Sequence, residues 1–274
     1  MAVTRETLLA DFLALGISPG MSVIVHSSMK SMGWVEGGPE AVIEALIDAV
    51  GPEGTILMPT FNPPVDRFYI AETPSRTGLL TETFRKRNDV LRSAHPTHSV
   101  AAWGKRAAEF IAGHERATAL GVGSPMHLCA EAGGYVLQIG VDFRTCSLIH
   151  VAEAIARVPY LEPVFYPGYD RPMTVVYPDG RERVVPPREN PGDSSGFLVV
   201  QEECERRGVI RHGKVGEAQA MLTRGEDILQ ATLDLLKRDV TILLCDRPTC
   251  RVCPRAREVC RNARRGTAPA SGGD

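Results

Sequence analysis

A strand, a polar loop, a helix and a second strand follow one another between residues 21 and 58, and this order constrains the fold more than any other feature. Apolar, β-forming residues fill Met21–His26 and again Gly54–Met58. Between them we expect a helix from Gly38 to Val50, because Pro39 suits the first turn of a helix. Such a βαβ unit joins parallel strands, so the sequence predicts an α/β fold.

A second strand–turn–helix unit contains the residues that we consider first for catalysis. The apolar run Tyr135–Val141 is too short for most helices and is expected to be a buried strand. In the helix that follows, His150 and Glu153 are three residues apart and share a face. Open α/β proteins usually bind ligands just past the carboxyl ends of their strands, where this pair lies. The alternative is a solvated helix face, which Arg157 would extend.

The later part of the chain predicts antiparallel strands as well. Met173–Tyr177 and Glu182–Val185 flank an Asp-Gly turn suited to a hairpin, which indicates a mixed sheet or a second small sheet. We expect Arg211–Glu217 to be a loop that enters a helix at Ala218, and Val240–Leu244 to be a last strand. The predicted fold is therefore a mixed central β-sheet with flanking helices.

Residues 1–244 are expected to form one domain, followed by a Cys-rich appendage (245–262) and a disordered Gly/Ala/Ser/Pro tail (263–274). A net charge of −2 excludes most nucleic-acid binders, which need a basic surplus. No apolar run approaches the roughly 20 residues of a membrane span, and Met1–Gly16 does not resemble a signal peptide. We expect a cytoplasmic protein with neither nucleic-acid nor membrane partners.

Four of the 7 cysteines are clustered with the spacing C-x4-C-x2-C-x6-C, namely Cys245, Cys250, Cys253 and Cys260. In a cytoplasmic chain such a cluster suits a tetrahedral zinc ion, and four thiolates would leave no open position, so its role would be structural. An iron–sulfur cluster is an alternative, as are reduced thiols, or disulfides in an oxidising compartment.

Two segments offer groups that can bind phosphate. The loop His26–Gly33 has hydroxyls, backbone N–H groups and one lysine, although it matches no known phosphate motif and a generic strand-to-helix loop is the alternative. Arg92, Ser93 and Ser99 form a second set, for which the alternative is a proline-shaped turn with one surface arginine.

Taken together, five stretches resemble the motifs of the aminoglycoside 3-N-acetyltransferase family. They occur in order between about residue 6 and about residue 240, and although each is a weak signal, five in order are specific. Two of them depart slightly from the family, with Ser147 in place of a threonine and Glu217 in place of an aspartate. The stretches are His26–Gly33 (HSSMKSMG), Arg92–Gly104 (RSAHPTHSVAAWG), Gly121–Leu128 (GVGSPMHL), Thr145–Glu153 (TCSLIHVAE) and Gly213–Ala218 (GKVGEA).

The resemblance implies an enzyme that transfers the acetyl group of acetyl-CoA to the 3-amino group of an aminoglycoside's deoxystreptamine ring and so confers antibiotic resistance. His150 falls on the family's catalytic histidine, and Glu153 on the glutamate of the same helix. The resemblance also implies cofactor contacts from the two phosphate-binding segments. These contacts are His26, Ser27, Ser28, Lys30, Ser31, Met32, Gly33, Arg92, Ser93, Ser99 and Val100.

The chemistry agrees with these roles. A histidine, with an unperturbed pKa of roughly 6.5, can take the proton that an amine must lose to attack a thioester. Glu153 is expected to orient the ring, with Glu217 or Asp142 as alternatives. Thr145, Ser147 or a backbone N–H is expected to stabilise the tetrahedral oxyanion. An acyl intermediate on Cys146, at the start of the helix, is a competing mechanism.

The acceptor is less constrained than the cofactor. Family members that modify aminoglycosides carry an acidic residue near the position of Phe197–Val200, which is apolar in this chain. A polycationic substrate requires carboxylates, so we expect contacts from Asp66, Asp142 and Asp193, with Phe61 as an aromatic contact. Two alternatives remain, namely acetylation of another small amine, or a non-catalytic CoA-binding protein with a metal-stabilised interaction module.

Overall fold

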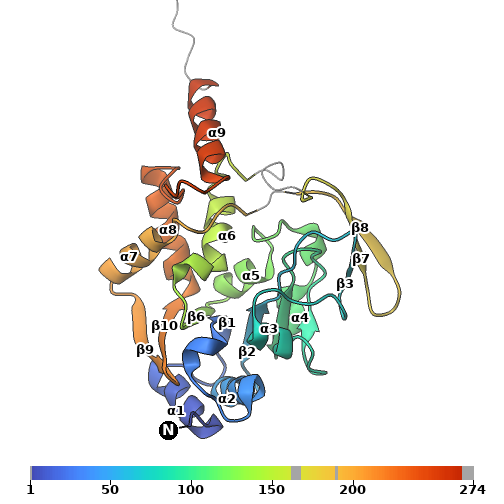
Figure 1. Ribbon diagram of the computed structural model, residues 1–274, viewed down its shortest axis with the longest axis vertical. Helices are drawn as coiled ribbons and strands as arrows, with labels where there is room; N and C mark the ends of the chain where they lie inside the picture. Colours follow the sequence, from blue (N-terminus) through green and yellow to red (C-terminus); the bar gives the residue numbers. More distant parts are fainter. Residues whose placement is uncertain (1, 162–167, 189–190, 267–274) are drawn as a thin grey trace, which may run out of the picture.

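The main sheet of the protein has seven strands in the order β4-β5-β2-β1-β6-β10-β9. Figure 1 labels the part of the sheet from β2 to β9. The fold was obtained as a computed structural model, which describes residues 2–161, 168–188 and 191–266. β1 is parallel to β2 and to β6, whereas the outer strands pair antiparallel, so the predicted mixed sheet is confirmed. The strands are β1 (Ser22–Ser27), β2 (Thr55–Pro59), β4 (Leu91–Arg92), β5 (Val100–Gly104), β6 (Tyr135–Ile139), β9 (Ile210–Val215) and β10 (Ala218–Arg224).

Helices cover both faces of this sheet, because neighbouring residues of the central strands point to opposite faces and both sets are apolar. Val23 and Val25 pack on one side with α1 (Arg5–Leu15), α2 (Gly38–Val50) and α3 (Leu79–Phe84). Ile24 packs on the other side. The helices there are α4 (Ala107–Ile111), α5 (Pro125–Glu131), α6 (Ser147–Ile155), α7 (Leu198–Arg206) and α8 (Gly225–Arg238).

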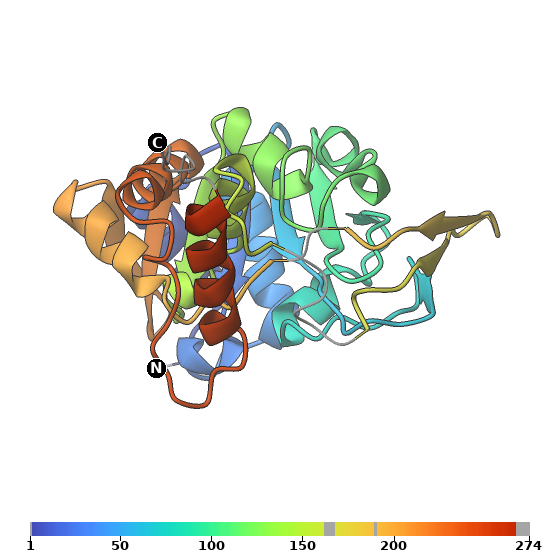
Figure 2. The ribbon, with the colours of Figure 1, turned by 90° about the horizontal axis from the view of Figure 1, so that it is seen from above.

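A second, three-stranded sheet consists of β3 (Arg67–Tyr69), β7 (Met173–Val176) and β8 (Glu182–Val185). β7 and β8 form the predicted antiparallel hairpin, and β3 pairs parallel to β7. Figure 2 shows this hairpin extending away from the main sheet. The long segment after β2 therefore contributes a strand to the small sheet before it returns to the main one.

Two sequence predictions are wrong in the later part of the chain. Arg211–Glu217 is not a loop that enters a helix at Ala218, because β9 and the strand β10, which begins at Ala218, form a hairpin through Gly216 and Glu217. β9 is an edge strand with three charged or polar residues and a glycine among its six, and this hid it from a search for apolar runs. Val240–Leu244 is not a strand. It is a turn in which Asp239 accepts a hydrogen bond from the backbone N–H of Thr241 at 2.9 Å.

The Cys-rich segment packs onto the body of the protein. It ends in α9 (Cys253–Gly266), so residues 263–266, predicted to begin the tail, are helical, and residues 267–274 lie outside the described residues. Cys253, Ala256 and Cys260 are buried in the same cluster as α6 and α8. Within the part of the chain that the structure describes, every helix is too short or too polar to cross a bilayer.

Candidate active site

The carboxyl ends of β1 and β6 lie side by side and bring two of the predicted site segments together. The two strands are parallel and pair Ser27 with Ile139, so the residues that follow each strand emerge at the same edge of the sheet. After β6 the chain makes a single turn, Phe143–Thr145, that is capped by the side chain of Asp142. It then enters α6, whose His150 lines the same cavity as His26 and Ser27 at the end of β1.

His150 and Glu153 form a buried hydrogen-bonded pair. Nδ1 of His150 lies 2.6 Å from Oε2 of Glu153, and the hydroxyl of Tyr160 donates to Oε1 of the same carboxylate at 2.8 Å. Glu153 is 1% exposed and His150 8%. The ring of Phe197 contacts the imidazole edge-on, with ring centroids 4.7 Å apart. A solvated helix face is therefore excluded, and Arg157 lies beyond the end of α6.

The role of Tyr160 was not predicted from the sequence, because Tyr160 lies after the end of α6, where helical spacing no longer applies. Burial and the neighbouring Glu153 raise the pKa of its hydroxyl, so the tyrosine remains a donor. Because both carboxylate oxygens are hydrogen-bonded, Glu153 has a fixed orientation. Nδ1 of the imidazole is occupied, and Nε2 is the nitrogen left to accept a proton from a bound molecule.

His150 borders a cavity of about 390 Å³. On the side of α6, the cavity is lined by Thr145 and Ser147, the predicted oxyanion groups. Other lining residues come from loops, and several of them were not singled out from the sequence. The remaining polar and aromatic lining residues are His26, Ser27, Phe61, Thr77, Thr81, His98, Arg144, Tyr169 and Ser194.

A second groove, of about 730 Å³, continues from this cavity along the loop after β1. The two share Ser27, Thr77 and Thr81, so a long ligand can reach from one to the other. Of the predicted cofactor contacts, Ser28, Lys30 and Gly33 line the groove. Ser31 and Met32 do not line it. Ser31 is hydrogen-bonded to Ser28, and Met32 is fully buried in the core.

Arg92 does not meet the prediction that it contacts a phosphate. Its guanidinium is buried and donates to the backbone oxygens of Thr60 at 2.9 Å and Ile70 at 3.1 Å, and to the hydroxyl of Ser99 at 3.0 Å. Burial lowers its pKa to about 9. Arg92 therefore ties the segment after β2 to the sheet, and residue type alone could not distinguish this role from a surface arginine.

The other predicted contacts of this segment are internal as well. The hydroxyl of Ser93 is hydrogen-bonded to Nδ1 of His114 at 2.8 Å and accepts from the backbone N–H of Val100 at 2.8 Å. Ser99 is fully buried, and Val100 begins β5. The geometry contradicts cofactor contacts from all three side chains, because none reaches the groove.

Glu217 and Asp142 are not the carboxylates that orient His150. Glu217, in the turn between β9 and β10, packs against Gly33, whose positive φ of 78° suits glycine and where an added Cβ would lie 2.5 Å from the glutamate. Asp142 pairs with Arg144 at 2.6 Å, which holds the pKa of the carboxyl below its usual value. Among the described residues, Glu153 is the carboxylate that is hydrogen-bonded to His150.

Of the four predicted acceptor contacts, only Phe61 lines the cavity. Its ring packs against His98, with centroids 4.7 Å apart. Asp66 is exposed on the small sheet and pairs with Arg171. Asp193 belongs instead to the cysteine cluster, where its carboxylate lies with the thiols of Cys245, Cys250 and Cys253.

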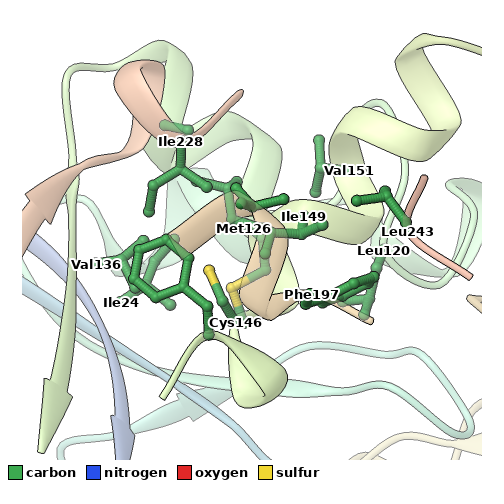
Figure 3. Close-up of a cluster of buried hydrophobic side chains, with 14 of the residues drawn as sticks. Ile24, Leu120, Met126, Val136, Cys146, Ile149, Val151, Phe197, Ile228 and Leu243 are labelled. Carbon is green, nitrogen blue, oxygen red and sulfur yellow. The ribbon is translucent and has the colours of Figure 1, made fainter. Parts of the chain in front are cut away.

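Cys146 is unsuited to act as a nucleophile. Its side chain is 1% exposed, and burial raises the pKa of the thiol to about 12. Figure 3 shows its sulfur within the apolar cluster that includes Met126 and Ile149. A thiol in this environment stays protonated at neutral pH, so the geometry favours direct transfer over an acyl intermediate.

The fold and the site define an α/β enzyme whose cavity is bordered by a buried histidine–carboxylate pair. The profile of the aminoglycoside 3-N-acetyltransferase family matches residues 24–237, and the chain belongs to this family. The resemblance predicted from the five motifs is thereby confirmed.

Individual relatives agree with this assignment. The SPbeta prophage-derived aminoglycoside N(3')-acetyltransferase-like protein YokD of Bacillus subtilis is 39% identical over 80% of this chain and 87% of the relative. Aminoglycoside N(3)-acetyltransferase IV of a Salmonella species is 34% identical over 88% of this chain and 90% of its own length. The crystal structure of aminoglycoside acetyltransferase AAC(3)-IVa as an apoenzyme superposes with a TM-score of 0.84 at 32% identity, over 94% of this chain and 98% of that chain.

Proposed function

We propose that this enzyme transfers the acetyl group of acetyl-CoA to the 3-amino group of the deoxystreptamine ring of aminoglycosides and so confers resistance to them. The observation that carries the proposal is the buried His150–Glu153–Tyr160 arrangement at the cavity that continues into the loop groove. Two solved relatives support the ligands. AAC-IIIb, at 28% identity and a TM-score of 0.73, is a binary complex with CoASH. A variant of AAC(3)-IVa, at 31% identity and a TM-score of 0.77, is in complex with apramycin.

In this proposal His150 is the general base. Nε2 takes a proton from the amine as the N–C bond to the acetyl carbon forms, and Glu153 stabilises the resulting imidazolium. The oxyanion of the tetrahedral intermediate is stabilised by Thr145, Ser147 or a backbone N–H at the start of α6. The C–S bond then breaks, and the imidazolium returns its proton to the sulfur of CoA.

The groove and the cavity would bind different substrates, with CoA in the groove and the acceptor in the cavity. The groove along the loop after β1 is long and carries Lys30 and Ser28, which suit the phosphates of CoA. The thioester end would then lie beside His150, where the groove opens into the cavity. The acceptor would occupy the part of the cavity lined by Phe61, Tyr169 and Ser194.

A specific observation favours a second candidate acceptor. Among the described residues that line the cavity, none is Asp or Glu, and Arg144 is present. Carboxylates are the groups that hold polycations, so a small amine with a single charge is also compatible with this cavity. A thiol-release assay with acetyl-CoA decides between them: a panel of deoxystreptamine aminoglycosides should release CoA faster than simple amines, and the reverse order would favour the second candidate.

We also infer that the Cys-rich segment binds a structural zinc ion. Three of its thiols converge, and two backbone N–H groups point at sulfurs, from Cys245 to Sγ of Cys253 at 3.3 Å and from Cys253 to Sγ of Cys250 at 3.4 Å. Such bonds stabilise thiolates, which are the form that binds metal. Unpaired cysteines agree with the reducing cytoplasm that the sequence predicts.

A non-catalytic CoA-binding protein is the remaining alternative. A protein that only binds CoA does not need a buried imidazole whose Nδ1 is hydrogen-bonded to a fixed carboxylate. If the protein bound acetyl-CoA but released no thiol with any amine, this alternative would replace the proposed enzyme. Loss of partner binding after Cys253→Ala, with binding kept in His150→Ala, would identify the interaction module.

A further inference from the structure

The loop that includes Asp193 has two faces with different surroundings. Pro191, Gly192 and Ser194 line the cavity together with His150. The carboxylate of Asp193, which lies between them in the chain, is instead grouped with the thiols of the Cys-rich segment. One short segment therefore contributes both to the wall of the active site and to the candidate metal centre.

The four side chains have the donor set and the spacing of a tetrahedral zinc site. One oxygen of Asp193 and the sulfurs of Cys245, Cys250 and Cys253 all lie within 4.8 Å of one another. Zinc–sulfur bonds of about 2.3 Å place ligands about 3.8 Å apart, so modest contraction around an ion completes the site. Asp193 is also oriented, because it accepts from the backbone N–H of Ser195 at 2.8 Å and pairs with Arg247 at 3.2 Å.

Cys260, the fourth cysteine of the spacing pattern, is not in this group. It lies on α9, two turns after Cys253, and is buried in the apolar cluster that also contains Tyr160. The sequence could not reveal that Asp193 joins the group in place of Cys260, because Asp193 precedes the first cysteine of the pattern by more than fifty residues.

We propose that Asp193, rather than Cys260, is the fourth ligand of the zinc ion, and that the metal thereby fixes the acceptor-side wall of the active site. The wall and the Cys-rich segment also approach closely beside the metal centre. A Cβ on Gly196 would lie 2.2 Å from the backbone oxygen of Leu243, so no side chain fits between them. The metal and this contact together clamp residues 191–196 against residues 243–253. Naming this wall as the acceptor side rests on the proposed function.

Cobalt substitution tests the ligand set without any assay of activity. The charge-transfer absorption of a cobalt(II) site grows with the number of coordinating thiolates. Cys260→Ala should keep one metal per chain and the wild-type absorption. Cys253→Ala should lose the part of the absorption that one thiolate contributes. Asp193→Ala should keep the thiolate absorption but bind metal at least about 10-fold more weakly. Asp246→Ala, which removes an exposed carboxylate beside Cys245, is the matched control and should bind as wild type.

The opposite pattern would overturn the ligand assignment. If Cys260→Ala lost one thiolate's absorption while Asp193→Ala behaved as wild type, the site would be the four-cysteine centre of the spacing pattern. If the purified wild-type protein held no metal and bound no cobalt, there would be no site.

The clamp is tested on the wild-type holoenzyme and on Asp193→Ala. Hydrogen exchange of the amides of residues 192–196 should accelerate in the variant. The KM for the acceptor should rise about 10-fold while the affinity for acetyl-CoA is unchanged. Unchanged exchange in Asp193→Ala would refute the clamp. If exchange accelerated but no amine were acetylated even by wild type, the clamp would stand and the proposed function would fail.

Discussion

Nδ1 of His150 lies 2.6 Å from Oε2 of Glu153, one turn further along the same buried helix. This spacing fixes the ring through a bond within a single element, so no movement between elements is needed to form the pair. A buried carboxylate is stabilised only when its oxygens are hydrogen-bonded, and Tyr160 satisfies the second oxygen. The imidazole therefore presents Nε2 in one orientation before any ligand binds, which is the preorganisation that general-base catalysis requires.

Tyr160→Phe should reduce both stability and turnover. The change leaves Oε1 of buried Glu153 without its donor, at a cost of about 1–3 kcal/mol in the free energy of unfolding. Turnover should fall about 10-fold, because a carboxylate that shifts to find another donor orients the imidazole less well. Denaturant unfolding and steady-state kinetics check both effects. Tyr177→Phe, on the β7–β8 hairpin, is the matched control, and equal effects of the two changes would contradict the role of Tyr160.

Cys146→Ala should retain near wild-type turnover. The thiol is buried with a pKa of about 12, so it contributes to packing and not to acyl transfer. Mass spectrometry of wild-type protein incubated with acetyl-CoA alone should show no acetylated cysteine. A stoichiometric acetyl adduct that vanished in the variant would show that the mechanism passes through an acyl intermediate.

Arg92→Met and Lys30→Ala should have different effects, because Arg92 stabilises the fold whereas Lys30 is proposed to contact acetyl-CoA. Arg92→Met removes the donors for several buried oxygens and should lower the free energy of unfolding by about 2–4 kcal/mol. Lys30→Ala, at an exposed position in the groove, should leave stability unchanged and raise the KM for acetyl-CoA up to about 10-fold. An Arg92→Met protein that is as stable as wild type but binds acetyl-CoA weakly would support the phosphate contact that the sequence predicted.

Acid should destabilise the protein between about pH 6.5 and pH 4. Burial lowers the pKa of His26 to about 4, and burial with the nearby His150 and His114 lowers that of His98 to about 3. Below pH 6.5 these histidines bind protons in the unfolded chain but stay neutral in the folded chain. The free energy of unfolding therefore decreases as the pH falls, by on the order of 3 kcal/mol for His26 alone. Urea unfolding at pH 7 and pH 5 should show a smaller difference for His98→Asn than for wild type. The exposed-site change His212→Gln should preserve the wild-type difference, and an identical loss in all three proteins would contradict the buried histidines as its cause.

The sequence predicted the parts of the site that depend on local pattern. The βαβ order predicted the parallel pairing of β1 with β2, and the spacing of His150 and Glu153 placed both on one helix face. It failed where burial decides the role of a residue, as for Arg92, whose donors serve the chain's own backbone. It also missed Tyr160, which follows the end of α6, and the grouping of Asp193 with cysteines more than fifty residues further along the chain. The edge strand β9 was missed because only its two end residues, Ile210 and Val215, are apolar, so it provides no apolar period.

The central claim is that His150 removes the proton from the attacking amine. The most direct test is the turnover of His150→Gln at saturating acetyl-CoA and aminoglycoside, with the affinity for acetyl-CoA measured in parallel. We predict a loss on the order of 100-fold or more in turnover, with acetyl-CoA bound as tightly as by wild type. Turnover within a few-fold of wild type in a variant that still binds acetyl-CoA would contradict the account.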